Sequence, residues 1–169
     1  NLFFNLTFSW IFLSLLISIA MIDIDEFWIP QDLINFGFIF GFLGLIFINI
    51  FNNRFIDFNL IVKNIGSSLI AFICFEAIRK FAKYIYKKDA IGKGDSKLIA
   101  MMAMWLGPLG IILCVFISYI YAAIFCLAGM SINIIKLKQV IPFAPFLSLG
   151  GLTVWFLGND FLIEKILRI

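Results

Sequence analysis

Six apolar stretches, separated by short segments that hold most of the charged residues, constrain the fold of this chain. Of its 169 residues, 63% are hydrophobic and 14% are charged, which gives more apolar surface than a soluble domain of this size can bury. A bilayer crossing takes about 20 apolar residues. We therefore predict an all-α fold, a polytopic membrane helical bundle with about six membrane segments that forms a single membrane-embedded domain over residues 1–169. The predicted segments are Leu2–Ile22, Leu33–Phe51, Asn59–Ile78, Leu98–Leu106, Leu109–Ile132 and Phe143–Ile163.

The fourth segment is too short to cross a bilayer. Leu98–Leu106 is followed at once by Gly107 and Pro108, and proline interrupts a helix because it lacks an N–H and clashes with the preceding turn. We predict a short half-inserted helix and a tight reversal at this point.

The chain begins with "NLFFNLTFSWIF", without an initiating methionine and without basic residues before the apolar run. A secretory signal carries positive charge at that place, so we read the first segment as a membrane helix. A fragment that lacks an upstream region is also compatible with this beginning.

Basic residues predict the orientation, because cytoplasmic loops of membrane proteins are enriched in lysine and arginine. If every segment reverses direction, the stretches after segments one, three and five share one side and hold nine basic residues, against four on the other. The nine are Arg79, Lys80, Lys83, Lys87, Lys88, Lys93, Lys97, Lys136 and Lys138, and the four are Arg54, Lys63, Lys165 and Arg168. We expect the first side to face the cytoplasm, with Arg79–Lys97 acting as an anchor to anionic lipid.

Composition argues against several classes of function. The chain has no histidine, and its three cysteines stand singly within apolar runs, so neither a metal site nor a disulfide is expected, and we predict no cofactor. A net charge of +3, with the lysines close to membrane segments, does not indicate binding to nucleic acid.

Two aspartates stand where apolar segments meet the predicted cytoplasmic boundary. Asp23 continues the run "SLLISIAMI", and Asp95 precedes the fourth segment in "GKGDSKL". Ionisable groups at such positions are rare and usually functional, although Asp95 could also serve as a helix cap. Gly92 and Gly94 allow unusual backbone conformations and close approach. No phosphate-binding glycine pattern accompanies them.

A solvated acidic cap is the simplest interpretation of Asp25, Glu26 and Asp32. Asp25 lies about 200° around a helix from Asp23 and should point elsewhere. Two carboxyl groups at one membrane face, by contrast, suit aspartic proteolysis, in which the pair shares a proton. They suit a proton-coupled transporter equally well.

Three motifs resemble the type IV prepilin leader peptidases, a family of GxGD intramembrane aspartyl proteases. They are "SIAMIDIDEFWIPQDL", "GKGDSKLIAMMAMWLG" and "IPFAPFLSLGG", in the order in which the family has them. The resemblance implies that Asp23 and Asp95 are the catalytic pair. It also implies that Gly92, Gly94 and Lys97 form an active-site loop, where Lys97 acts in the site or only snorkels to the interface.

The sequence departs from the family pattern at two positions. Gln31 stands where the family has Asp or Asn after Pro30, and Ala144 replaces the glycine of the closing motif. We expect packing, not chemistry, from Pro142, Phe143 and Pro145 of that motif.

The implied function is cleavage of the basic leader from a prepilin or pseudopilin at the cytoplasmic face of the bacterial inner membrane. Asp25, Glu26 and Asp32 are then candidates for attracting the leader. The longer family members carry upstream paired CxxC motifs and an amino-terminal methyltransferase activity, and nothing corresponding stands in this sequence. A proton-coupled transporter and a non-catalytic assembly factor are the alternatives, and the sequence does not predict the oligomeric state.

Overall fold

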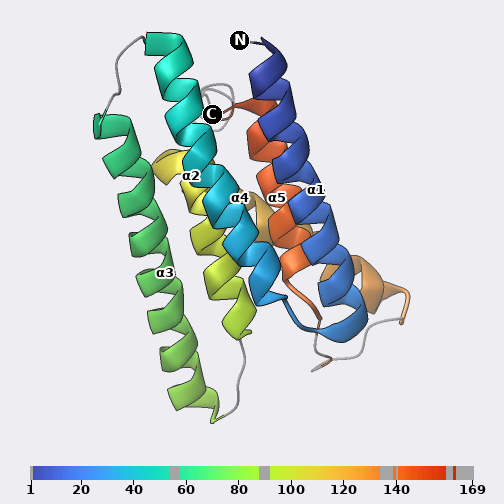
Figure 1. The fold of residues 1–169 in the computed structure, drawn as a ribbon. Coiled ribbons are helices and arrows are strands. Elements are labelled where there is room, and N and C mark those ends of the chain that lie inside the picture. Colours follow the sequence, from blue (N-terminus) through green and yellow to red (C-terminus); the bar gives the residue numbers. More distant parts are fainter. Residues whose placement is uncertain are drawn as a thin grey trace.

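The structure, a computed structural model, describes residues 2–53, 58–87, 92–133, 139, 141–158 and 162. Five helices make up this part of the chain. Helices α1, α2 and α3 alternate in direction, and α4 reverses within itself. The end of α1 and the beginnings of α2, α4 and α5 therefore meet at one end of the bundle, which we call the site end (the lower end of Figure 1). The described ranges contain no strand, which confirms the all-α prediction. The helices are α1 (Leu2–Glu26), α2 (Gln31–Asn53), α3 (Phe58–Tyr86), α4 (Lys93–Ser131) and α5 (Ala144–Leu157).

Three of these helices contain stretches that are long and apolar enough to cross a membrane, namely Leu6–Glu26, Phe58–Ile85 and Lys93–Ser131. The apolar stretches Gln31–Phe47 and Ala144–Leu157 are shorter, and α5 rises only about 21 Å against the ~30 Å of a hydrocarbon core. The predicted count of about six membrane segments is therefore not confirmed.

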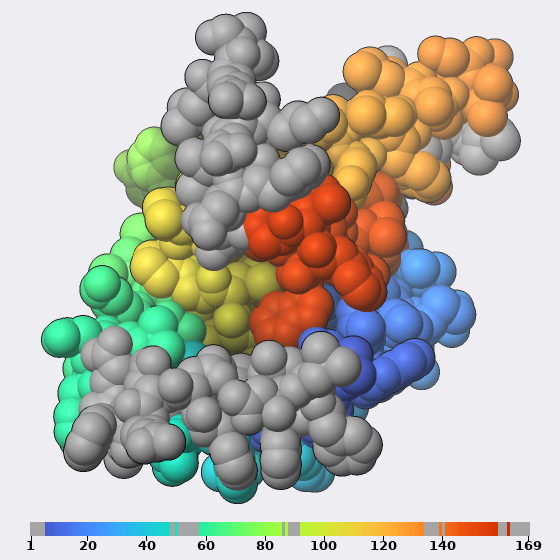
Figure 2. Space-filling model, turned by 90° about the horizontal axis from the view of Figure 1, so that it is seen from above, coloured from blue at the N-terminus to red at the C-terminus, as the bar shows by residue number. Residues whose placement is uncertain are grey.

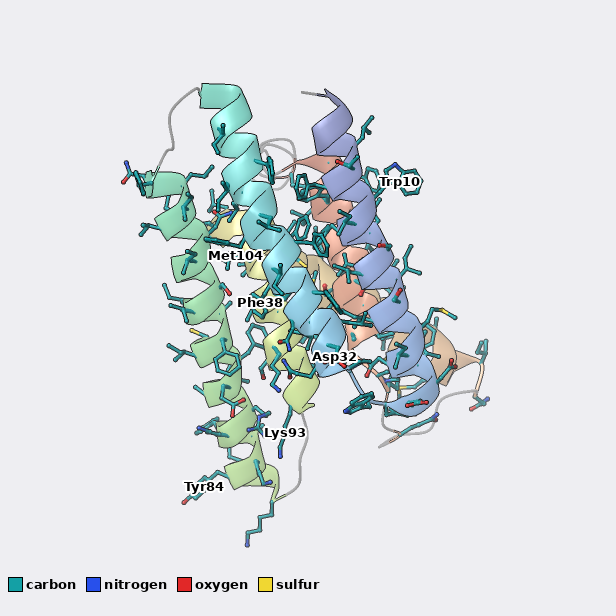
Figure 3. The ribbon with its side chains drawn as sticks, in the orientation of Figure 1. Trp10, Asp32, Phe38, Tyr84, Lys93 and Met104 are labelled. Atoms are coloured by element: carbon teal, nitrogen blue, oxygen red, sulfur yellow. The ribbon has the colours of Figure 1, made fainter. Side chains whose placement is uncertain are left out.

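Large apolar side chains cover the outside of the bundle. Trp10 is 71% exposed and points away from α1 (Figure 3), and Ile70 on α3 and Phe116 on α4 are also exposed. Helices that are apolar on their outer faces as well as in their core fit a lipid environment and not water.

Helix α4 is broken at Gly107, where φ is 71° and ψ is −177°. Only glycine adopts this backbone conformation readily. Residues 93–106 (the first arm) run away from the site end, and residues 108–131 (the second arm) return toward it (Figure 1). Tyr119 of the second arm consequently lines the same cavity as Asp95 of the first, although 24 positions of straight helix would separate them by about 36 Å. The predicted interruption and reversal are confirmed, whereas half-insertion into a membrane stays a prediction.

Polar side chains of α3 satisfy the carbonyl groups near this break. The Asn64 amide donates to the Met104 carbonyl at 3.1 Å, which is the carbonyl that Pro108 would have paired with if it carried an N–H. Ser67 and Ser68 donate to two further carbonyls of the first arm, at 3.1 and 2.7 Å. An unpaired carbonyl is costly in apolar surroundings, so this polar face of α3 stabilises the reversal.

Close backbone approach holds α2 and α5 against α4. A Cβ on Gly41 of α2 would lie 2.7 Å from the Trp105 indole nitrogen, and one on Gly150 of α5 would lie 2.2 Å from the Ser118 hydroxyl. Trp105 also donates to the Gly37 carbonyl at 2.9 Å and stacks on Phe12 of α1 with ring centroids 4.9 Å apart. Seen from above, α5 lies between α1 and α4 (Figure 2).

Helices α3 and α4 extend furthest beyond their predicted apolar limits. Helix α3 continues past Ile78 to Tyr86, and α4 begins at Lys93 instead of Leu98. Charged residues do not end these helices because lysine and arginine are good helix formers, and Arg79 is paired with Glu76 one turn earlier.

The hydrogen bond from Asn64 yields a test of the break. Replacing Asn64 by Leu leaves the Met104 carbonyl buried without its donor, and we expect the free energy of unfolding to fall by about 1–3 kcal/mol. Thermal unfolding in detergent would measure this loss. Gly66→Ala is the matched control on the same helix, because an added Cβ there meets nothing within 4 Å. Equal stability of Asn64→Leu and the wild type would contradict the account of the reversal.

Candidate active site

Asp23 lies in the last turn of α1 and is only 6% exposed. The helix ends one turn later at Phe27, whose φ is 54° and whose N–H donates to the Asp23 carbonyl at 3.1 Å. This is the left-handed C-cap arrangement, adopted here by a non-glycine residue at a cost of about 1–2 kcal/mol. Asp25 and Glu26 are exposed, as expected from their different angle around the helix.

The carboxylate of Asp23 caps α5. Its Oδ2 accepts a hydrogen bond from the Ala144 N–H at 3.1 Å, at the first residue of a helix whose own N-cap, Phe143, offers no side-chain cap. The first N–H groups of a helix need external partners and favour negative charge. Sequence reasoning assigned packing alone to the closing motif and missed this contact, whose one available signal was the absence of a capping side chain before α5.

Asp95 lies in the first turn of α4 and is 8% exposed. Its carboxyl group lies against Gly92, the N-cap residue, on which a Cβ would lie 3.2 Å from the Asp95 Oδ2. Both aspartates thus lie beside the positive end of a helix, α5 for Asp23 and α4 for Asp95.

Gly94 allows α4 to pack closely against the connection between α1 and α2. A Cβ on this residue would lie 2.9 Å from Cβ and Cδ1 of Ile29, in the connection between α1 and α2. The prediction that Gly92, Gly94 and Lys97 form a loop is wrong, because Gly94 and Lys97 lie inside α4 and Gly92 is its N-cap, with φ of −63°. Close approach, and not an unusual backbone conformation, explains Gly94.

A cavity of about 810 Å³ joins the two acids. The end of α1, the α1–α2 connection, both arms of α4 and residues 141–143 line it. Asp23 and Asp95 both line this cavity, and their carboxyl groups are close enough to interact electrostatically. Two largely desolvated carboxyl groups at such proximity cannot readily ionise together, so the cavity favours one proton on the pair.

Lys97 links α4 to α2 at the edge of this cavity. Its ammonium donates to the Gln31 side-chain oxygen, and the Gln31 amide donates in turn to Asn35 at 3.0 Å. Gln31, one of the departures from the family pattern, therefore accepts the Lys97 hydrogen bond with a neutral group.

The three acids predicted to attract a leader lie at the site end but outside the cavity lining. Asp25 and Glu26 are the last two residues of α1, and Asp32 lies in the first turn of α2 (Figure 3). All three are exposed. The structure places them at the same end of the bundle as Asp23 and Asp95, and does not bring them into contact with that pair.

The chain is similar to proteins of one known family. A family model described as the type IV leader peptidase family matches residues 10–127. A prepilin leader peptidase/N-methyltransferase of Legionella pneumophila is 31% identical over 92% of this chain and 52% of its own length. A type 4 prepilin-like proteins leader peptide-processing enzyme of Escherichia coli O78:H11 is 28% identical over 84% of this chain and 48% of its own length.

The chain spans about half the length of these curated relatives. No solved structure matches it. The family model covers more than half of the chain and includes both Asp23 and Asp95, and on this ground the chain belongs to the type IV leader peptidase family.

Proposed function

We propose that this chain is a membrane-embedded aspartic endopeptidase that removes the basic leader from type IV prepilins or prepilin-like proteins. The observation that carries the proposal is the meeting of Asp23 and Asp95, both buried, in one cavity. The printed names of the relatives, which describe the processing of prepilin leaders, support the substrate class.

The chemistry uses one proton shared by the pair. The ionised carboxylate takes a proton from a water molecule as that water attacks the scissile carbonyl carbon, and the protonated carboxyl donates its proton to the carbonyl oxygen. The backbone N–H of Ala144 holds the carboxyl group of Asp23 in place. Neither step requires a histidine or a serine nucleophile.

The position of the cavity at the end of the bundle suits a substrate whose scissile bond lies just outside the end of its own helix. A scissile bond must be released from helical hydrogen bonding before it is attacked, and the cavity lies where α1 ends and α4 begins. We propose that the apolar helix of the substrate lies in the lipid beside the bundle while its extended leader junction enters the cavity.

We propose that the site end faces the cytoplasm of a bacterium, at the inner membrane. Among the described residues, six basic side chains lie at or near the site end and Lys63 lies toward the other, in keeping with the enrichment of cytoplasmic segments. The six are Arg79, Lys80, Lys83, Lys87, Lys93 and Lys97. The remaining members of the sequence-based count, namely Arg54, Lys88, Lys136, Lys138, Lys165 and Arg168, lie outside the described residues.

Substitution of either catalytic acid tests the proposal. Asp23→Asn and Asp95→Asn should each abolish cleavage of a purified prepilin, because an amide cannot exchange the proton. Both variants should keep the thermal stability of the wild type, since asparagine has nearly the shape of aspartate and its side-chain oxygen at position 23 can still accept the hydrogen bond from Ala144. Glu76→Gln, which neutralises an acid of α3 that pairs with Arg79 and does not line the cavity, is the control and should cleave normally. Normal turnover by either catalytic variant on a gel would refute the assignment, and proton-coupled uptake into liposomes without cleavage would favour a transporter.

Charge reversal tests the role of the exposed acids. A variant with Asp25→Lys, Glu26→Lys and Asp32→Lys should bind a basic leader more weakly, so KM should rise at low salt while kcat changes little. The difference from wild type should shrink as salt screens the charges. An unchanged KM at low ionic strength would remove these residues from leader binding.

The contact at Gly94 generates a further prediction. A methyl group there forces α4 away from Ile29, and a displacement near 1 Å at a reacting pair can lower turnover by on the order of 100-fold. We expect Gly94→Ala to reduce kcat to that extent, whereas Gly66→Ala, where the added group meets open space, should leave it unchanged. Full activity of Gly94→Ala in the same cleavage assay would show that this contact does not position Asp95.

A further inference from the structure

We propose that Tyr119 is a further catalytic residue of this site, whose phenol donates a hydrogen bond to the carbonyl oxygen of the scissile peptide. The inference rests on the proposed peptidase function. It assigns a role to a residue that none of the sequence motifs contains.

The reversal of α4 brings Tyr119 to the site. The residue belongs to the second arm, yet it lines the cavity together with Asp23 and Asp95. A tyrosine in the middle of an apolar helix normally places its hydroxyl where a polar partner can reach it. Tyr119 is 51% exposed, and its other surroundings include the polar groups that line the cavity.

The closing motif positions the ring. Tyr119 packs on Phe143 with ring centroids 5.1 Å apart and an interplanar angle of 36°. Phe143 directly precedes Ala144, whose N–H is bonded to Asp23. One short segment therefore supports both the carboxylate of Asp23 and the tyrosine ring, and fixes their relative placement.

Tyr119 and Asp95 line the same cavity, and no hydrogen bond joins them. Asp95 acts on Tyr119 electrostatically, but in the described part of the chain no hydrogen bond is formed by the Tyr119 hydroxyl, whereas the ammonium of Lys97, another donor at the cavity, is bonded to Gln31. The Tyr119 hydroxyl and the Asp95 carboxyl group lie at one cavity, so both can donate a hydrogen bond to the carbonyl oxygen of a peptide bound there. Tyr119 thus supplies a neutral donor where a peptide carbonyl would lie.

The proposed role leaves the proton balance of the reaction unchanged. A bond forms between the water oxygen and the carbonyl carbon, the ionised carboxylate takes a proton from the water, and the protonated carboxyl gives its proton to the carbonyl oxygen. Tyr119 keeps its own proton and donates a hydrogen bond to that oxygen while negative charge develops on it. Collapse of the tetrahedral intermediate then breaks the C–N bond, and the amine leaves with a proton returned by the pair.

The test is Tyr119→Phe, which removes the hydroxyl and keeps the ring on Phe143. We expect kcat for a purified prepilin to fall by about 10- to 100-fold, with KM within twofold of the wild type and an unchanged unfolding temperature. Tyr121→Phe is the matched control, because the Tyr121 hydroxyl pairs with Thr153 at 3.1 Å and does not line the cavity. This variant should keep the wild-type kcat.

Binding measurements separate a catalytic role from a structural one. A peptide inhibitor with a tetrahedral hydroxyl group in place of the scissile carbonyl should bind Tyr119→Phe about tenfold more weakly or worse, and an uncleaved prepilin bound to the Asp95→Asn background should bind equally well with or without the tyrosine. A wild-type kcat in Tyr119→Phe, or an equal loss in Tyr121→Phe, would overturn the inference. Failure of the wild type itself to cleave prepilin would refute the proposed function instead.

Discussion

The structure depends on how backbone carbonyl groups are satisfied where α4 breaks in apolar surroundings. A helix that reverses inside a membrane protein leaves carbonyl groups without their usual partners, and Pro108 removes one N–H outright. The polar face of α3 supplies the missing donors, chiefly the Asn64 amide to the Met104 carbonyl. Because the break is stabilised there, the second arm can return to the site end and the closing motif can follow it to Asp23.

The N-terminal ends of two helices stabilise negative charge on the buried aspartates. Asp23 and Asp95 are both nearly excluded from solvent, and burial alone disfavours the ionised carboxylate that the reaction requires. Asp23 accepts a backbone hydrogen bond at the N-terminal end of α5, and Asp95 lies in the first turn of α4. At both places the positive end of the helix dipole stabilises negative charge. Repulsion between the two carboxyl groups opposes double ionisation, and the two effects together favour the singly protonated pair.

The all-α fold, the interruption at Gly107–Pro108 and the position of Asp23 and Asp95 at one end of the bundle could be predicted from the sequence, because hydropathy, the Gly-Pro pair and the ends of the apolar segments carry that information directly. It did not predict that α3 and α4 extend into charged stretches, since hydropathy marks where apolar surface ends and not where helical hydrogen bonding ends. Nor did it reveal the donor at Ala144, because a backbone N–H leaves no signature in residue type. Tyr119 could not be identified from the sequence, because only the reversal of α4 brings it to the cavity.

The departures from the family pattern bear on charge more than on shape. Ala144 is fully buried, and it donates to Asp23 through its backbone, so the methyl group that replaces a hydrogen leaves the contact in place. At Gln31 the neutral amide holds Lys97 without neutralising it, whereas an aspartate could have formed an ion pair there. Under the proposed function, the positive charge of Lys97 at the edge of the cavity would repel a basic leader at close range. The exposed acids of α1 and α2, outside the cavity, would then attract the leader, and its recognition would be separated in space from its cleavage.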